Sequence, residues 1–200
     1  IIEVPAYRYV DEPGHTGGYL AFGPGGNLYI GTGDDTNPHA SDGYTPIDER
    51  PGREHYDAQR SAANTNDLRG KILRIHPEPD GSYTIPSGNL FPPGTARTRP
   101  EIYAMGFRNP FRFSVDMETG WISVGDYGPD AGAANPNRGP EGTVEWNLIK
   151  EPGFYGWPYC VGDNIPYNDY NFATGASGAK FNCSAPVNDS PNNTGLTNLP

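Results

Sequence analysis

Short runs of alternating apolar and polar residues recur along the chain, and glycine, proline, asparagine or aspartate bounds each run. Such runs are typical of β-strands, and no segment sustains the 3.6-residue apolar period of a long helix. The pattern predicts an all-β protein with one short helix near Ala58–Leu68. The predicted strands are Tyr19–Phe22, Asn27–Thr32, Lys71–His76, Ile102–Met105, Arg112–Val115, Trp121–Val124 and Glu145–Ile149.

Two of the predicted hairpins resemble each other and end on the same dipeptide. The turn Gly23–Gly26 joins the first hairpin, because glycine tolerates the positive φ of tight turns. Asp116–Gly120 joins the second, and the hairpins end on Gly33-Asp34 and Gly125-Asp126, 92 residues apart. Propeller blades repeat about every 40–50 residues, so this separation fits two blades. An ordinary β-sandwich with two similar hairpins fits the same pattern.

The length and the cysteines extend this picture. A closed propeller needs roughly twice this length of chain, so we expect residues 1–200 to be part of a single propeller domain in a longer protein. Residues 160–200 form a loop-rich segment that contains the only two cysteines, Cys160 and Cys183. This arrangement favours a disulfide that closes the segment, in a secreted, extracellular or periplasmic protein; free buried thiols are the alternative.

The composition argues against two classes of partner. Lysine and arginine total 14 against 24 aspartates and glutamates, which gives a net charge of −10. So acidic a chain is poorly suited to nucleic acid, whose phosphate backbone attracts clustered cations. No stretch approaches the 18 or so consecutive apolar residues of a transmembrane helix, so no membrane span is expected. The 27 glycines and 22 prolines indicate many turns.

His15 and Asp34 are the first candidates for chemistry. His15 lies among Gly14, Gly17 and Gly18 just before a predicted strand, where small residues allow a ligand to approach the backbone. Asp34 closes the next predicted strand, a place from which a carboxylate often points into a pocket. The plain alternatives are a solvated loop histidine and an acidic loop held by Asx turns.

Two further dipeptides could bind charged ligands. Arg108-Asn109 follows a predicted strand, and the planar fork of arginine donors fits a carboxylate; a structural arginine bound to backbone carbonyls is the alternative. Gly128-Pro129 presents carbonyl oxygens that could bind a hard cation, unless it is a plain turn. The carboxylates from Asp34 to Asp42 offer a second site for calcium.

In this order, the segments resemble the glucose/sorbosone dehydrogenase family, which includes soluble quinoprotein glucose dehydrogenase and the aldose sugar dehydrogenases. The resemblance runs from about residue 15 to residue 160, and each segment is weak alone but specific in combination. The segments are His15-x-Gly17-Gly18, Gly33-Asp34, Leu68–Ile75, Gly106-x-Arg108-Asn109-Pro110, Gly128-Pro129 and Tyr155–Pro158.

The resemblance implies a six-bladed β-propeller, of which this chain would be about half. It implies a sugar dehydrogenase that uses pyrroloquinoline quinone (PQQ) and Ca²⁺ to move a hydride from the anomeric carbon of an aldose to the quinone. The expected partners are the sugar and an external electron acceptor.

The resemblance also assigns roles to single residues. The general base falls on His15, and the aspartate that orients it falls on Asp34. The pair that contacts the quinone falls on Arg108 and Asn109. The carbonyls that bind calcium fall on two further residues, Gly128 and Pro129. If these roles hold, the side chains should converge on one pocket, with His15 about 2.6–3.2 Å from Asp34.

The sequence departs from the family at two points. Tyr127 stands where family members carry glutamine or histidine, and an insertion spans Asp130–Gly142. The later lysine and arginine contacts to the cofactor fall beyond residue 200. The alternative function is therefore a secreted propeller without a cofactor, which binds carbohydrate or a protein partner.

Overall fold

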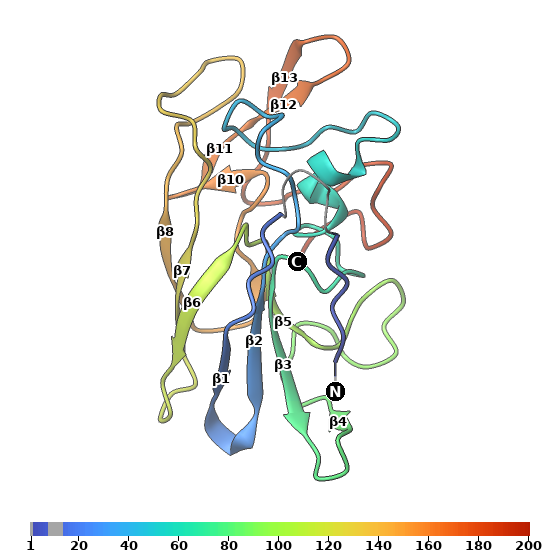
Figure 1. The fold of residues 1–200 in the computed structure, drawn as a ribbon, viewed down its shortest axis with the longest axis vertical. Coiled ribbons are helices and arrows are strands. Elements are labelled where there is room, and N and C mark those ends of the chain that lie inside the picture. Colours follow the sequence, from blue (N-terminus) through green and yellow to red (C-terminus); the bar gives the residue numbers. More distant parts are fainter. Residues whose placement is uncertain (1, 8–13) are drawn as a thin grey trace.

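The computed structural model describes residues 2–7 and 14–200, and most of its regular elements are β-strands. Figure 1 shows two sheets side by side, with several of the long loops gathered at one end of them. In chain order the strands and short 3-10 turns (η) are β1 (Leu20–Phe22), η1 (Pro24–Gly26), β2 (Leu28–Thr32), η2 (Glu54–Tyr56), η3 (Ala58–Arg60), β3 (Lys71–Pro77), β4 (Tyr83–Thr84), β5 (Ile102–Met105), β6 (Pro110–Val115), β7 (Ile122–Asp126), β8 (Glu145–Ile149), β9 (Gly153–Phe154), β10 (Cys160–Val161), β11 (Ile165–Pro166), β12 (Asn168–Asn171) and β13 (Ala176–Lys180).

The larger sheet is built on the predicted first hairpin. Its strand order is β1-β2-β3-β5-β9, and β4 pairs with β3. All these pairs are antiparallel except β5 with β9, which is parallel. The turn between β1 and β2 requires glycine because φ is 71° at Gly25 and 73° at Gly26, a region that side chains with a Cβ disfavour.

The second predicted hairpin belongs to a separate sheet. Strands β6, β7 and β8 form an antiparallel three-stranded sheet in that order. The prediction that the two hairpins lie in different sheets is therefore confirmed. Each of the seven predicted strands corresponds to an observed strand, with bounds that differ by at most two residues.

The two sheets pack face to face and share a core. The core side chains come from strands of both sheets, with Phe107 added by the turn after β5. They are Tyr29, Ile72, Tyr103, Ala104, Phe107, Phe113, Ile122, Val124 and Ile149. The contact between the sheets fixes the ends of β2 and β7 near each other, which matters for the site described below.

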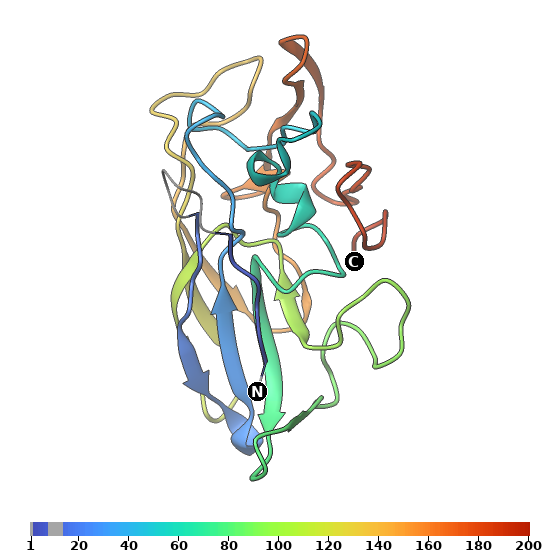
Figure 2. The ribbon, with the colours of Figure 1, turned by 45° about the vertical axis from the view of Figure 1, so that its right-hand side comes forward.

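The two outer faces differ. The outer face of the larger sheet is covered by side chains from distant segments, including Val4, Phe91 and Leu196. The N-terminal segment runs along this face (Figure 2). The outer face of the three-stranded sheet is open, with Trp146 75% exposed and Leu148 47% exposed.

The predicted helix near Ala58–Leu68 is wrong. Only η3, a single 3-10 turn, is helical there, and turns and irregular backbone follow. The side chains of Asp57, Asn64 and Asp67 accept hydrogen bonds from backbone N–H groups two residues further on. Such local bonds compete with helical ones, so this polar segment turns repeatedly instead.

The C-terminal segment is held by the predicted disulfide between Cys160 and Cys183, whose Cα atoms lie 6.0 Å apart. It contains two small hairpins, β10–β11 and β12–β13, between loops. Within the described residues, no helix is both long and apolar enough to cross a membrane.

Candidate functional site

The candidate site lies where β2 and β7 end, opposite the turns of the two hairpins (Figure 1). The glycine-rich loop around His15 runs beside the end of β2. The N–H of Asp35 donates to the carbonyl of His15 at 2.9 Å, and the N–H of Gly18 donates to Gly31 at 2.7 Å. Gly33 has to be glycine, because a Cβ there would overlap the carbonyl of His15.

Asp34 is fully buried, and four donors surround its carboxylate. Nδ1 of His15 lies 2.8 Å from Oδ1, and Nε1 of Trp157 donates to Oδ2 at 2.8 Å. Thr36 donates through its N–H at 3.0 Å and its hydroxyl at 2.8 Å. The expected contact between His15 and Asp34 is therefore confirmed. Trp157, which sequence analysis left without a role, is a further partner.

The environment keeps Asp34 ionised. Burial alone would raise its pKa, but the charge and hydrogen bond of His15, the charge of Arg108 and the N–H of Thr36 outweigh burial. The pKa of Asp34 therefore lies below its ordinary value. Because an ionised carboxylate can only accept hydrogen bonds, Nδ1 of His15 carries the proton.

His15 faces an open pocket of about 320 Å³. Arg108 and Asn109 line the same pocket, together with Tyr127 and Asp130. Within the described part of the chain, no hydrogen bond involves Nε2 of His15. With Nδ1 protonated, Nε2 has a free lone pair and can accept a proton from a ligand in the pocket. The predicted convergence of residues 15, 108 and 109 is confirmed, with Asp34 behind the imidazole.

Arg108 presents a guanidinium that is only loosely engaged. One terminal nitrogen donates to the carbonyl of Tyr127 at 3.4 Å, and the other lies 3.6 Å from the carboxylate of Asp130. The guanidinium carbon lies 5.9 Å from the ring centroid of Trp157. Asp130 is exposed, so its ion pair with Arg108 is weak. An anionic ligand in the pocket could displace Asp130 from the guanidinium.

Asn109 connects the loop that carries His15 to the end of β7. Its side-chain oxygen accepts a hydrogen bond from the N–H of Gly17 at 3.1 Å, which ties it to the loop of His15. Its own N–H donates at 2.7 Å to Asp126, the last residue of β7. Burial raises the pKa of Asp126 to about 7, and the charges of Glu145 and Asp34 add to the rise.

Gly128 and Pro129 lie beside this pocket. With Arg108 and Glu145, they line a cavity of about 10 Å³, enough for about one water-sized particle. In the described residues, neither carbonyl of this dipeptide accepts a hydrogen bond. Gly142 packs closely on the carbonyl of Pro129, where a Cβ would overlap it. Calcium takes six to eight oxygen ligands, of which two such carbonyls would be a minority.

The loop from Asp34 to Asp42 gives no support to the second calcium site predicted there. Its carboxylates are occupied by cations: Asp35 accepts from Arg69 at 2.9 Å, and Asp42 lies 3.1 Å from Arg138. Nowhere in residues 2–7 and 14–200 do three acidic, histidine or cysteine side chains group around a possible metal.

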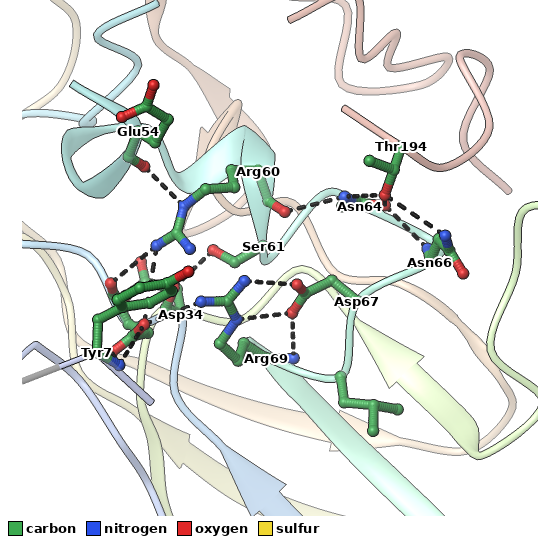
Figure 3. A network of polar contacts seen from close by, with 12 residues as sticks. Tyr7, Asp34, Glu54, Arg60, Ser61, Asn64, Asn66, Asp67, Arg69 and Thr194 are labelled. Atoms are coloured by element: carbon green, nitrogen blue, oxygen red, sulfur yellow. Dashed lines mark hydrogen bonds and ion pairs between the residues drawn. The ribbon is translucent and has the colours of Figure 1, made fainter. Parts of the chain in front are cut away.

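A polar network supports the site from behind (Figure 3). Arg69 pairs with both oxygens of Asp67 and reaches Asp35, while the hydroxyl of Ser61 donates to the carbonyl of Asp34 at 2.6 Å. The positive φ of 55° at Asp35 lets two consecutive aspartates serve different partners. Asp34 holds the imidazole, and Asp35 fixes the loop to this network.

Two packed and mainly antiparallel sheets, with an imidazole and a guanidinium sharing one pocket where the strands end, are the arrangement expected of neighbouring propeller blades. The model of the Glucose / Sorbosone dehydrogenase family matches residues 5–190. The chain therefore belongs to the glucose/sorbosone dehydrogenase family.

Known proteins resemble parts of this chain. The HIPL2 protein of Arabidopsis thaliana is 31% identical over 171 residues, which cover 76% of this chain and 20% of that protein. A solved structure from Thermus thermophilus, assigned as an oxidoreductase of the glucose dehydrogenase type, is 31% identical with a TM-score of 0.50. The match covers 80% of this chain and 36% of that one.

A second solved structure, a glucose dehydrogenase, is 26% identical with a TM-score of 0.50, over 84% of this chain and 38% of that one. The fold is therefore a partial β-propeller. The chain spans closer to a third than to half of these solved chains, and about a fifth of its curated relative.

Proposed function

We propose that the protein carrying this chain is a PQQ- and calcium-dependent aldose dehydrogenase, in which His15 is the general base. The observation that carries the proposal is the contact of 2.8 Å between Nδ1 of His15 and the buried Asp34, beside the pocket that His15 lines. Membership of a family of sugar oxidoreductases supports the same reaction class.

In this proposal, Nε2 of His15 removes the proton from the anomeric hydroxyl of the sugar while a hydride leaves the anomeric carbon. Asp34 holds the imidazole in the tautomer that can accept this proton and stabilises the imidazolium that results. The quinone, when bound with Ca²⁺, supplies the acceptor for the hydride and its two electrons. The sugar is thereby oxidised to the lactone, and an external acceptor later takes the electrons.

Arg108 and Asn109 would bind the quinone. The guanidinium of Arg108 reaches the pocket with one exposed carboxylate as its ionic partner, which suits a ligand that carries carboxylates. The free carbonyls of Gly128 and Pro129 would bind the calcium ion. We further propose a secreted or periplasmic location, since disulfides such as Cys160–Cys183 persist in oxidising compartments.

The test uses the full-length protein supplied with PQQ and Ca²⁺. We expect the quinone absorbance to appear on the protein and aldoses to be oxidised with a reducible dye as acceptor. Omission of either PQQ or Ca²⁺ should abolish the activity. A folded protein that binds carbohydrate but neither takes up quinone nor reduces the dye would contradict the proposal and favour the cofactor-free binding protein.

A further inference from the structure

Asp126 occupies a position in the second sheet that corresponds to Asp34 in the first. Both residues follow a glycine at the end of the second strand of a hairpin, and both carboxylates are buried. The partners differ, because Asp34 receives an imidazole whereas Asp126 receives two consecutive backbone N–H groups. These are the N–H of Arg108 at 3.0 Å, on Oδ2, and the N–H of Asn109 at 2.7 Å, on Oδ1.

The Arg108-Asn109 dipeptide is thereby held from both sheets. The carbonyl of Arg108 accepts the N–H of Asp34 at 2.8 Å, and the carbonyl of Asn109 accepts the N–H of Tyr127 at 3.2 Å. Together with the two bonds to Asp126, all four backbone polar groups of the dipeptide are satisfied by the residues that close β2 and β7. Few backbone conformations can meet four such bonds at once, so the direction in which both side chains leave the dipeptide is fixed.

The geometry therefore assigns Asp126 as a positioning residue: its carboxylate sets the Arg108-Asn109 turn, so that the guanidinium of Arg108 receives an anionic ligand in the pocket. Through the bond from Gly17 to the side chain of Asn109, the same carboxylate also steadies the loop of His15. The role of Arg108 in binding the quinone rests on the proposed function.

The two hydrogen bonds join one buried side chain to two consecutive N–H groups, so its removal leaves both donors without that partner. Loss of such bonds typically weakens the dependent interaction by about 10- to 100-fold. We expect D126A to weaken quinone binding by this factor. D126N, which keeps one acceptor oxygen in the same shape, should fall between D126A and the wild type.

A matched control exists at the other end of the same hairpin. Asp116 also accepts two consecutive backbone N–H groups, those of Glu118 and Thr119, but it lies in the turn far from the pocket. D116A should lower the melting temperature and leave quinone binding unchanged. If D126A lost quinone binding only because the protein became less stable, D116A should lose quinone binding as well.

The decisive measurement is a double-mutant cycle in the full-length protein, with PQQ binding followed by absorbance. If Asp126 acts through Arg108, D126A should have little effect on PQQ affinity once Arg108→Ala is present. Additive losses, or no loss in D126A and D126N, would overturn the assignment. Hydrogen exchange supplies a second readout: D126A, but not D116A, should speed exchange at the amides of Arg108 and Asn109.

The same experiments distinguish failure of the proposed function from failure of the positioning role. If the wild type binds no PQQ, the proposed function fails, and the positioning role is judged on the exchange rates alone. Faster exchange at the two amides in D126A would then support it, and unchanged exchange would overturn it.

Discussion

The ends of β2 and β7 both carry a Gly-Asp dipeptide in the same local setting, but the two aspartates have different partners. At β2, Asp34 follows Gly33 and collects side-chain donors from His15 and Trp157. At β7, Asp126 follows Gly125 and collects backbone donors from the turn after β5. A repeated strand–turn–strand unit thus delivers a buried carboxylate to the same end of each sheet.

The difference comes from what the chain brings opposite each carboxylate. A loop with three glycines brings an imidazole to Asp34, and the imidazole keeps the pKa of that carboxyl low against the effect of burial. Asp126 meets only neutral N–H groups beside Glu145, and burial raises its pKa to about 7. The repeat fixes the position of each carboxylate, while non-local partners decide whether it holds a side chain, as Asp34 holds His15, or a backbone turn, as Asp126 does.

The largest expected effect is that of D34N. The amide can donate to Nδ1 of His15 and favour the wrong tautomer, and it cannot stabilise an imidazolium. We expect the turnover number for aldose oxidation to fall about 10²- to 10⁴-fold in the full-length protein with saturating PQQ.

The matched control for D34N is D35N at the neighbouring residue. That carboxylate is also buried but faces Arg69, so D35N should cost stability and leave turnover within a few-fold of the wild type. Equal losses of turnover in both variants would show that the comparison between carboxylates does not hold.

A smaller effect is expected for W157F. The phenyl ring retains the packing but removes the indole N–H that donates to Asp34 at 2.8 Å. Loss of a hydrogen bond to a charged group corresponds to about 1.5 kcal/mol or more, so turnover should fall about tenfold. W121F, at an exposed position directly before β7, should change neither turnover nor melting temperature. An unchanged turnover in W157F would mean that His15 and Thr36 hold Asp34 without the indole N–H.

Acid should reveal the lowered pKa of Asp34. A carboxyl whose folded pKa lies below its unfolded value stabilises the fold above that unfolded value, about 3.8. This contribution is lost as the pH falls below 3.8 through the folded pKa. Melting temperatures of the full-length protein between about pH 6 and pH 2 should therefore fall less steeply in D34N than in the wild type. Parallel curves would contradict the assigned pKa direction.

The smallest expected effect is that of D130N. The exposed carboxylate of Asp130 lies 3.6 Å from Arg108 and competes with an anionic ligand. Exposed ion pairs contribute about 0.2–1 kcal/mol, so PQQ affinity should rise by at most about fivefold. The gain should shrink at high salt, where exposed charges are screened. Weaker binding in D130N would mean that Asp130 supports the ligand instead of competing with it.

Much of the fold was predictable because strand signals are local. The apolar run at the start of Leu28–Thr32 and the alternation along Ile122–Asp126, each preceded by a turn that contains glycine, are sufficient to indicate hairpins. The helix predicted near Ala58–Leu68 was wrong because the polar side chains of Asp57 and Asn64 bond to nearby backbone N–H groups and compete with helical hydrogen bonds.

The site was predictable in part. His15, Asp34, Arg108 and Asn109 stand in motifs, so their types and order could indicate a shared pocket. Nothing local to Trp157 indicates its bond to Asp34, 123 residues away in sequence. For Asp126, the only signal was its place at the end of the repeated unit, and its partners depend on how the two sheets pack.

The central claim is that the imidazole held by Asp34 is the proton acceptor of the reaction. The most direct measurement is the turnover number of H15A in the full-length protein, with saturating aldose, PQQ and Ca²⁺. H76A is the control, because His76 lies on β3 beside Asn27 and away from the pocket. The account predicts a loss of about 10²- to 10⁴-fold in H15A, with PQQ affinity and melting temperature close to those of the wild type. Unchanged turnover in H15A would contradict it.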